Sequence, residues 1–154
     1  MQTRRGPTRN VRGRSRSSFP RISASVPRTT SVKRTARYKI PKIRFDQITR
    51  AVLGPRYELS LVICGDGLAR RVNRAYRKKD HAANVLSFSI SRTEGEMFLN
   101  ARASAREARR YGVSVRARLA LLFVHGLLHL KGLPHGRTME REERRVLRAF
   151  DLEN

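Results

Sequence analysis

Apolar and polar residues alternate with period two in four segments of the chain, a pattern typical of β-strands. The predicted strands are residues 38–45, 57–64, 85–90 and 96–100. Residues 57–64 are apolar on both faces at their end, so we expect this strand to lie in the middle of the sheet. Pro41 places residues 38–45 near a sheet edge, and a turn at Glu94-Gly95 joins the last two segments as a hairpin.

Apolar residues recur at helical spacing in five further segments, each preceded or ended by a residue that suits a helix terminus. These segments begin near Asp46, Leu68, Ser104, Val115 and Thr138. We expect Asp46, Asp66, Ser114 and Thr138 to cap helices, because their side-chain oxygens can accept the free N–H groups of a first turn. The order strand, helix, strand, helix in the first half predicts a layered α/β arrangement.

The charge of the chain is strongly positive, which narrows the class of partner. The 154 residues contain 35 Lys and Arg against 12 Asp and Glu, a formal net charge of +23. A chain of this kind binds polyanions, and nucleic acid is the first candidate. The longest apolar run, residues 119–124, is too short to span a bilayer, so no membrane partner is expected.

Residues 1–36 are rich in Arg, Ser, Thr and Pro and poor in large apolar side chains. Such a segment cannot bury enough surface to offset its ordering entropy. We therefore predict a basic, disordered N-terminal extension over residues 1–36 and a single folded domain over residues 37–154. The single Cys64 fits a reducing compartment, and we expect a cytoplasmic protein. The composition of the extension is also typical of a transit peptide, which would make the protein organellar.

Three of the four histidines, His125, His129 and His135, lie within eleven residues. His125 and His129 are four residues apart, so a helix here places both imidazoles on one face. Gly132 ends this helix and Pro134 keeps it from resuming, so the chain can turn back and carry His135 toward the other two. Three neutral imidazoles with a fourth position open to water are the ligand set of a catalytic zinc site.

A simpler interpretation makes His125 and His129 core histidines of an apolar helix, but the third histidine and its turn favour the metal site. Gly126 stands where the metalloprotease helix has its general base, a Glu, which argues against peptide hydrolysis. The simplest role of this glycine is close packing of the helix against a neighbour.

Arg77 ends the predicted helix that begins near Leu68 and leads a short basic run with Lys78 and Lys79. A cation in this position interacts favourably with the helix dipole, which is a purely structural role. A guanidinium can instead grip a phosphate with two parallel hydrogen bonds. The spacing alone leaves both roles open.

Two segments together resemble the YbeY family of metal-dependent endoribonucleases that act in ribosomal RNA maturation. Residues 125–135 are similar to the family pattern H-G-x-L-H-L-x-G-x-D-H, and residues 72–88 (VNRAYRKKDHAANVLSF) to L-N-x-x-Y-R … T-D-V-L-S-F. Residues 94–97 resemble the family's glycine-acid hairpin, and the likeness covers roughly residues 38–152. This sequence departs from the pattern at Pro134, Ala83, Asn84 and Glu96.

The resemblance implies that residues 37–154 are a single metal-hydrolase-like catalytic domain with the family's fold. This fold is α+β (α/β-like), with a small mixed sheet of about four strands and about five helices. It implies that one Zn²⁺ per chain is bound by His125, His129 and His135 on a helix and the following turn. It also implies that Arg77 contacts the scissile phosphate as a catalytic residue, and we expect Arg77, Lys78 and Lys79 to bind RNA.

We therefore expect a zinc-dependent, single-strand-specific endoribonuclease that acts in rRNA processing, rRNA maturation and ribosome quality control. Its expected partners are rRNA or rRNA precursors and ribosomal particles. One alternative is a non-catalytic, ribosome-associated RNA-binding protein in which the zinc is structural. The other is a metal-dependent hydrolase of another class, such as a peptidase.

Overall fold

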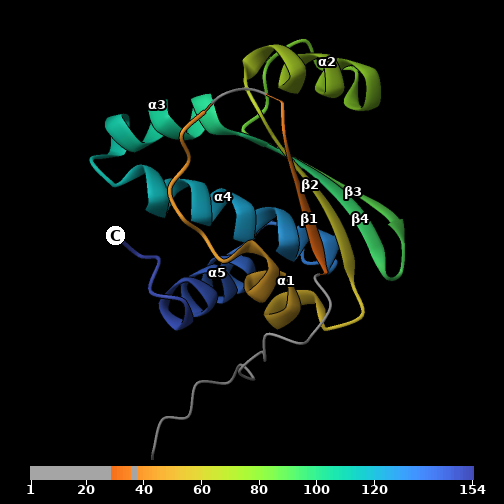
Figure 1. The fold of residues 1–154 in the computed structure, drawn as a ribbon, viewed down its shortest axis with the longest axis vertical. Coiled ribbons are helices and arrows are strands. Elements are labelled where there is room, and N and C mark those ends of the chain that lie inside the picture. The colour runs from red at the N-terminus through yellow and green to blue at the C-terminus, as the bar shows by residue number, and fades with distance from the viewer. Residues whose placement is uncertain (1–28, 36–37) are drawn as a thin grey trace, which may run out of the picture.

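The fold combines one mixed β-sheet with five helices in the part of the chain that the structure, a computed structural model, describes: residues 29–35 and 38–154 (Figure 1). The strands are β1 (Thr30–Arg34), β2 (Glu58–Cys64), β3 (Val85–Ser91) and β4 (Glu94–Asn100). The helices are α1 (Phe45–Leu53), α2 (Asp66–Arg77), α3 (Ala101–Tyr111), α4 (Val115–Leu130) and α5 (Arg137–Ala149). The predicted α+β fold, with about four strands and about five helices, is confirmed.

The sheet has the strand order β1-β2-β4-β3, with β2 in its interior. β2 runs parallel to β1 and β4, whereas β3 and β4 form an antiparallel hairpin. Leu61 and Ile63 of β2 are fully buried, which confirms the prediction that this segment is a central strand. The predicted hairpin is also confirmed, but its turn lies at residues 92–93 rather than at Glu94-Gly95.

The edge strand next to β2 is β1, and the prediction of an edge strand at residues 38–45 is wrong. Residues 38–44 have no regular structure, and Phe45 begins α1. The predicted disorder of residues 1–36 is also wrong for residues 29–35, because β1 gains a backbone ladder along β2 and an anchor at its first residues. Residues 1–28 and 36–37 lie outside the described part of the chain, so the rest of that prediction stays a prediction.

Only one of the four expected caps is observed. Ser114 accepts a hydrogen bond from the Ala117 N–H at the start of α4, whereas α1, α2 and α5 begin without a side-chain cap, so the predictions for Asp46, Asp66 and Thr138 are wrong. The two carboxylates bind other elements instead, where each gains several hydrogen bonds. Asp46 binds the start of β1, and Asp66 binds α3 and the end of β4.

Helix α4 is the centre of the hydrophobic core, with α1, α3 and α5 packed around it on one face of the sheet (Figure 1). Phe123 of α4 is fully buried and meets Phe45 of α1 edge to face, with 4.8 Å between ring centroids. α2 covers the opposite face through a small second cluster that includes Cys64 and Ala69. Burial raises the pKa of the Cys64 thiol to about 11, so this cysteine is a protonated core residue at neutral pH.

Gly126 lets α4 approach the sheet closely at the level of the histidines. A Cβ at this position would lie 2.7 Å from Met97 Cε and 3.1 Å from Val85 Cγ2. The predicted packing role of this glycine is therefore confirmed, because any larger side chain would push the helix away from β3 and β4.

No single helix among the described residues is long and apolar enough to cross a membrane. Only the bent pair of α3 and α4, taken together, passes that test of length and composition.

Asp46 provides the first testable prediction, because its carboxylate holds β1 against α1. Oδ1 accepts hydrogen bonds from Thr29 N (2.5 Å), Thr29 Oγ1 (2.8 Å) and Thr30 N (2.8 Å). Partial burial alone would raise the pKa of Asp46, but these hydrogen bonds and the charge of Arg50 lower it below the usual value. Asp46→Ala should reduce the free energy of unfolding at neutral pH by about 2 kcal/mol.

The pH dependence of this difference follows from the direction of the pKa shift. A carboxylate with a lowered pKa in the folded protein stabilises it fully above the unfolded pKa of about 3.9, and this stability is lost as the pH falls through the lower folded value. Urea denaturation of wild type and Asp46→Ala should therefore converge at acid pH. Asp46→Asn keeps an acceptor oxygen and should lose less; equal stability of wild type and alanine variant at neutral pH would contradict the anchoring role.

Candidate metal centre

The three histidines are brought together by the end of α4 and the turn that follows it. His125 and His129 lie on successive turns of the helix, as their spacing predicts. After Leu130 the chain reverses at Gly132, whose φ of +98° suits glycine, and Leu133 N donates to Leu128 O at 3.0 Å. This reversal carries His135 back over the helix end.

The imidazoles form a compact triangle. Their ring centroids are 4.6 Å apart for His125 and His129, 5.1 Å for His125 and His135, and 4.5 Å for His129 and His135. One ring nitrogen of each lies within 4.8 Å of the others. His125 and His129 are half-buried and His135 is exposed, so the triangle opens to solvent on one side. This arrangement can hold a metal ion with a position left for a further ligand.

Glu143 of α5 fixes the orientation of His125, a role that was not predicted from the sequence. Its Oε1 lies 2.6 Å from His125 Nδ1. A carboxylate only accepts, so Nδ1 carries the proton and Nε2 keeps its lone pair for a metal. The sequence contains one signal for this role: Glu143 lies on the same face of the helix as the buried residues Met139 and Val146, four residues after the first and three before the second.

His129 is held in its neutral form. Burial is the largest cause that lowers the pKa of His129, followed by the neighbouring imidazoles of His125 and His135 and the charge of Arg77, while a backbone hydrogen bond with Leu133 acts in the opposite direction. A metal binds the neutral imidazole, so the lowered pKa keeps the lone pair available at neutral pH.

A cleft of about 430 Å³ opens beside the triangle. Its walls are the loop before β3 and one side of α4 and α5; the lining residues are His81, Ala82, Ala83, Asn84, Val85, Arg118, Leu121, Leu122, His125 and Glu143. Asn84, which replaces a carboxylate of the family pattern, donates from its amide to Glu107 Oε1. Glu107 also accepts from Arg118 Nε at 2.5 Å, so α3 supplies a carboxylate behind this wall of the cleft.

Two buried asparagines hold residues 81–84, the loop that forms one wall of the cleft. Asn73 of α2 donates to His81 O at 2.9 Å, and Asn100 of β4 donates to Ala83 O at 3.2 Å. The Asn100 backbone N–H also donates to Asn84 O at 2.9 Å. Residues 81–84 are therefore fixed from two sides, and the cleft has a defined shape before any ligand binds.

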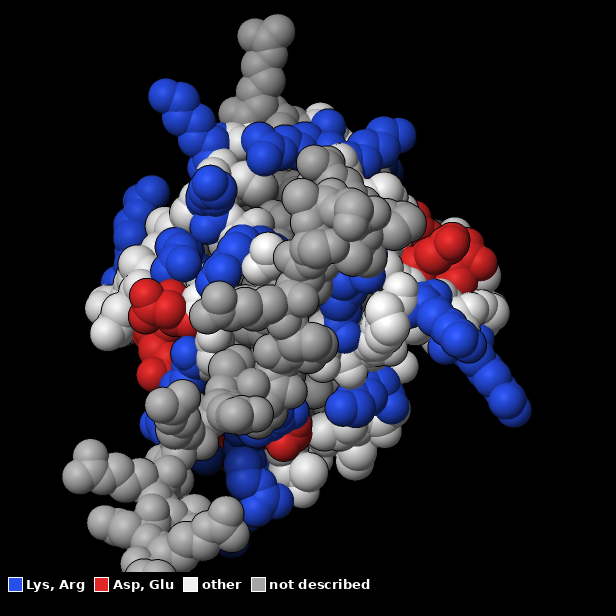
Figure 2. Space-filling view, turned by 60° about the horizontal axis from the view of Figure 1, so that its bottom comes forward, with Lys and Arg blue, Asp and Glu red and all other residues white. Residues whose placement is uncertain are grey.

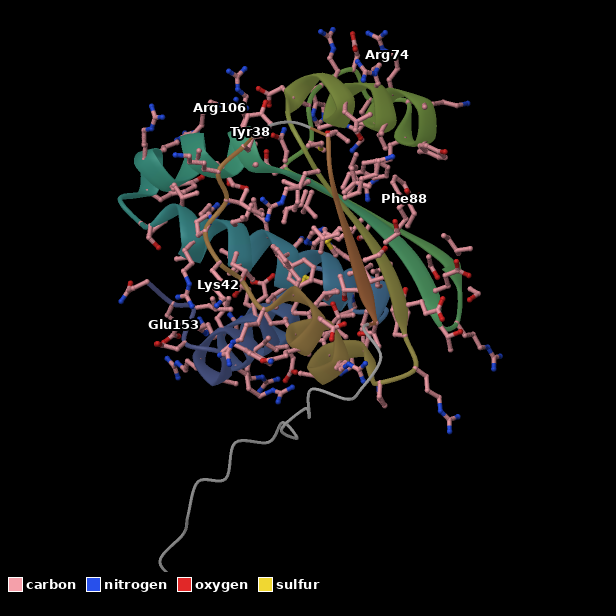
Figure 3. All side chains as sticks on the ribbon, in the orientation of Figure 1. Tyr38, Lys42, Arg74, Phe88, Arg106 and Glu153 are labelled. Atoms are coloured by element: carbon pink, nitrogen blue, oxygen red, sulfur yellow. The ribbon has the colours of Figure 1, made fainter. Side chains whose placement is uncertain are left out.

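Arg77 is the last residue of α2, as predicted, and its side chain is exposed. Its charge is the smallest of the causes that lower the pKa of His129, after burial and the two neighbouring imidazoles, and Arg77 is not among the residues that line the cleft described above. Lys78 and Lys79 follow it and are also exposed. By contrast, Arg74 points away from the sheet (Figure 3), where it and Arg70 bind the carboxylate of Asp80.

Comparisons with known proteins agree with this geometry. The family model described as endoribonuclease YbeY matches residues 29–151. That range starts at the first residue before β1 and includes all three histidines, Arg77 and Glu143. The residues that form the site therefore lie within the region that matches the family.

Similar proteins are found over most of the chain. An endoribonuclease YbeY from Geobacter metallireducens is 41% identical over 117 residues, which are 69% of this chain and 78% of that protein. One from Geobacter sulfurreducens is 37% identical over 126 residues, or 73% of this chain and 84% of that protein. A solution structure of a Thermotoga maritima protein matches with a TM-score of 0.54 and 14% identity over 79% of this chain and 90% of that one, which is a similarity of fold.

Glu143 provides the second prediction. Glu143→Ala should weaken the binding of a divalent metal about 10- to 100-fold, because His125 then loses the partner that fixes its ring and its proton. The measurement is a competition titration against a chelator of known affinity. Glu142→Ala is the matched control, since the neighbouring carboxylate pairs with Arg145; equal metal affinity of the Glu143 and Glu142 variants would show that Glu143 does not position the ligand.

Proposed function

The chain belongs to the endoribonuclease YbeY family, and from this premise we propose that it is a zinc-dependent, single-strand-specific endoribonuclease that acts on rRNA and its precursors. We also propose a role in ribosome quality control and binding to ribosomal particles in the cytoplasm. If the residues that precede β1 are a transit peptide, the protein acts in an organelle instead. The observation that carries the proposal is the triangle of three histidine nitrogens within 4.8 Å of one another at the edge of a cleft.

The donor set fits zinc. His125 Nε2 and His129 Nε2 face each other at 3.0 Å, and His125 Nδ1 already carries the proton of that ring. Two nitrogen ligands of a tetrahedral zinc ion are about 3.3 Å apart when each bond is about 2.0–2.1 Å. The two lone pairs therefore stand near the separation that one shared ion requires, and His135 completes a three-nitrogen set.

A bound zinc ion would supply acidification of a water molecule and polarisation of a phosphoryl oxygen. The chain's own residues do the rest. Glu143 holds His125 in one tautomer, and the carboxylate can stabilise the imidazole as electron density is drawn to the metal. Residues 81–85 and α4 hold the RNA strand in the cleft, away from bulk water.

Arg77 binds the phosphate of the RNA bond that is cut. Its charge reaches the histidine triangle, and a guanidinium can form two parallel hydrogen bonds to non-bridging oxygens. The charge that grows on these oxygens during cleavage is then stabilised more strongly than the charge of the ground state. Lys78 and Lys79 extend the positive surface along the path of the RNA.

The surface supports RNA as the substrate. Lys and Arg side chains are spread over the face shown in Figure 2, and acidic side chains form only small groups among them. The net charge of +23 provides affinity for RNA through counterion release, independent of sequence. The cleft, at about 430 Å³, is small for a ligand pocket and suits a single nucleotide better than a paired duplex.

Removal of the metal provides the third prediction. Fragments of rRNA with unpaired segments are incubated with the protein, with and without a chelator, and the products are mapped. We expect about one zinc per chain, and His129→Ala should lose most of the zinc and the cleavage. His81→Ala is the matched control for metal content, because His81 lies outside the triangle and should leave zinc binding intact. Zinc binding without any metal-dependent cleavage would favour the RNA-binding alternative with structural zinc.

Arg77→Lys provides the fourth prediction. The variant should fold and bind zinc normally but cleave RNA about a hundredfold more slowly, because an ammonium group cannot replace the planar fork of a guanidinium. Single-turnover cleavage rates are the measurement. Arg74→Lys is the control, since Arg74 is engaged with Asp80 on the outer side of α2. Near-normal cleavage by Arg77→Lys would assign Arg77 only a role at the helix end.

A further inference from the structure

Tyr111 is a large exposed aromatic residue flanked by arginines. It is the last residue of α3, and its side chain is 56% exposed. The guanidinium carbons of Arg118 and Arg110 lie 5.0 Å and 5.9 Å from the centroid of its ring. A ring presented to solvent between two cations is a surface on which a nucleobase can stack.

The ring lines a hollow that adjoins the cleft of the metal centre. This hollow has a volume of about 380 Å³ and lies between the end of α3, α4, α5 and the C-terminal residues. Arg118, Leu121 and Glu143 line both the hollow and the cleft that contains His125. The two depressions are therefore neighbours that share these three side chains; His125 lines one of them and Tyr111 lines the other.

Hydrogen bonds and an ion pair hold the backbone beside Tyr111 and the side chain of Arg118 in place. Gly112 adopts a φ of +65° and ends α3, while Val113 N donates to Ala108 O at 3.0 Å. Ser114 then caps α4 one residue later. Arg118 is fixed in turn by its ion pair with Glu107, so the ring and the guanidinium hold their relative positions without a ligand.

We infer that Tyr111 and Arg118 form a stacking subsite for an unpaired base of the RNA, on a nucleotide next to the one that is cut. The inference rests on the proposed endoribonuclease function. The base lies on the Tyr111 ring above the apolar side chains of Val113, Leu121 and Leu147. Arg118, which lines both depressions, faces the phosphate between this base and the metal centre.

The chemistry of the hollow favours a base over a phosphate. Three carboxylates along its lining, Glu140, Glu143 and Glu153, outnumber the two guanidinium groups of Arg118 and Arg144, so the hollow is less favourable for an anion than for a neutral group. Figure 3 shows Glu153 near the C-terminal end of the chain, on the side of the molecule away from the sheet. A neutral base avoids this repulsion, and its amino groups can donate hydrogen bonds to such carboxylates.

The test is a scan with oligonucleotides that are single-stranded, contain one cleavage site and carry one abasic residue at successive positions around it. Wild type should show an increase in KM of about tenfold at one position, where the missing base would stack on Tyr111. Tyr111→Ala should raise KM for the intact oligonucleotide by a similar factor with little change in kcat, and it should no longer respond to the abasic residue at that position. Tyr111→Phe and Tyr111→Trp keep a ring and should retain the response.

Controls separate this inference from the function on which it rests. Ile90→Ala removes an exposed apolar side chain from the hairpin and should behave as wild type. Unchanged zinc content and melting temperature of Tyr111→Ala would show that the fold is intact. If wild type cleaves no RNA, the proposed function is wrong, and the same scan read by fluorescence anisotropy still tests the subsite. An abasic response that Tyr111→Ala retains in full, or no response in wild type, would overturn the subsite.

Discussion

The structure depends on one constraint: α4 must be buried as the central helix of the core and still present two polar imidazoles to a cleft. The two requirements are met at different positions along the helix. Its middle, around Phe123, is closed off by α1, α3, α5 and the sheet, whereas His125 and His129 lie half-buried near its end. Gly126, between them, lets the helix approach Met97 closely. The histidines are therefore held by a helix that is packed against the sheet and not by a flexible loop.

The same packing connects the core to the chemistry of the metal centre. Glu143 reaches His125 because Met139 and Val146 bury the inner face of α5 against α4. A shift of α5 would therefore change the hydrogen bond that fixes the proton of His125. The second carboxylate, Glu107, connects α3 to the cleft walls through Asn84 and Arg118. Stability of the fold and geometry of the site thus share the same contacts.

Much of the architecture could be predicted from the sequence because it depends on local periodicity. The alternation in residues 57–64 predicts the central strand, and the spacing of His125, His129 and the Gly132 turn predicts the triangle. What could not be predicted depends on contacts between distant segments. β1 has little apolar pattern, since only its first residue is buried and the strand is held by the ladder along β2 and by Asp46. Glu143 also escaped prediction, because its spacing from Met139 and Val146 places it on the inner face of a highly charged helix but does not show which residue of another element it contacts.

We propose that the three histidines form an open zinc site of catalytic type. X-ray absorption spectroscopy of the zinc-loaded full chain is the decisive measurement, since it reports the number and type of ligand atoms. We expect three imidazole nitrogens at about 2.0–2.1 Å and one further light atom from solvent, without sulfur. A sulfur ligand at about 2.3 Å, or four ligands all supplied by the protein, would contradict it.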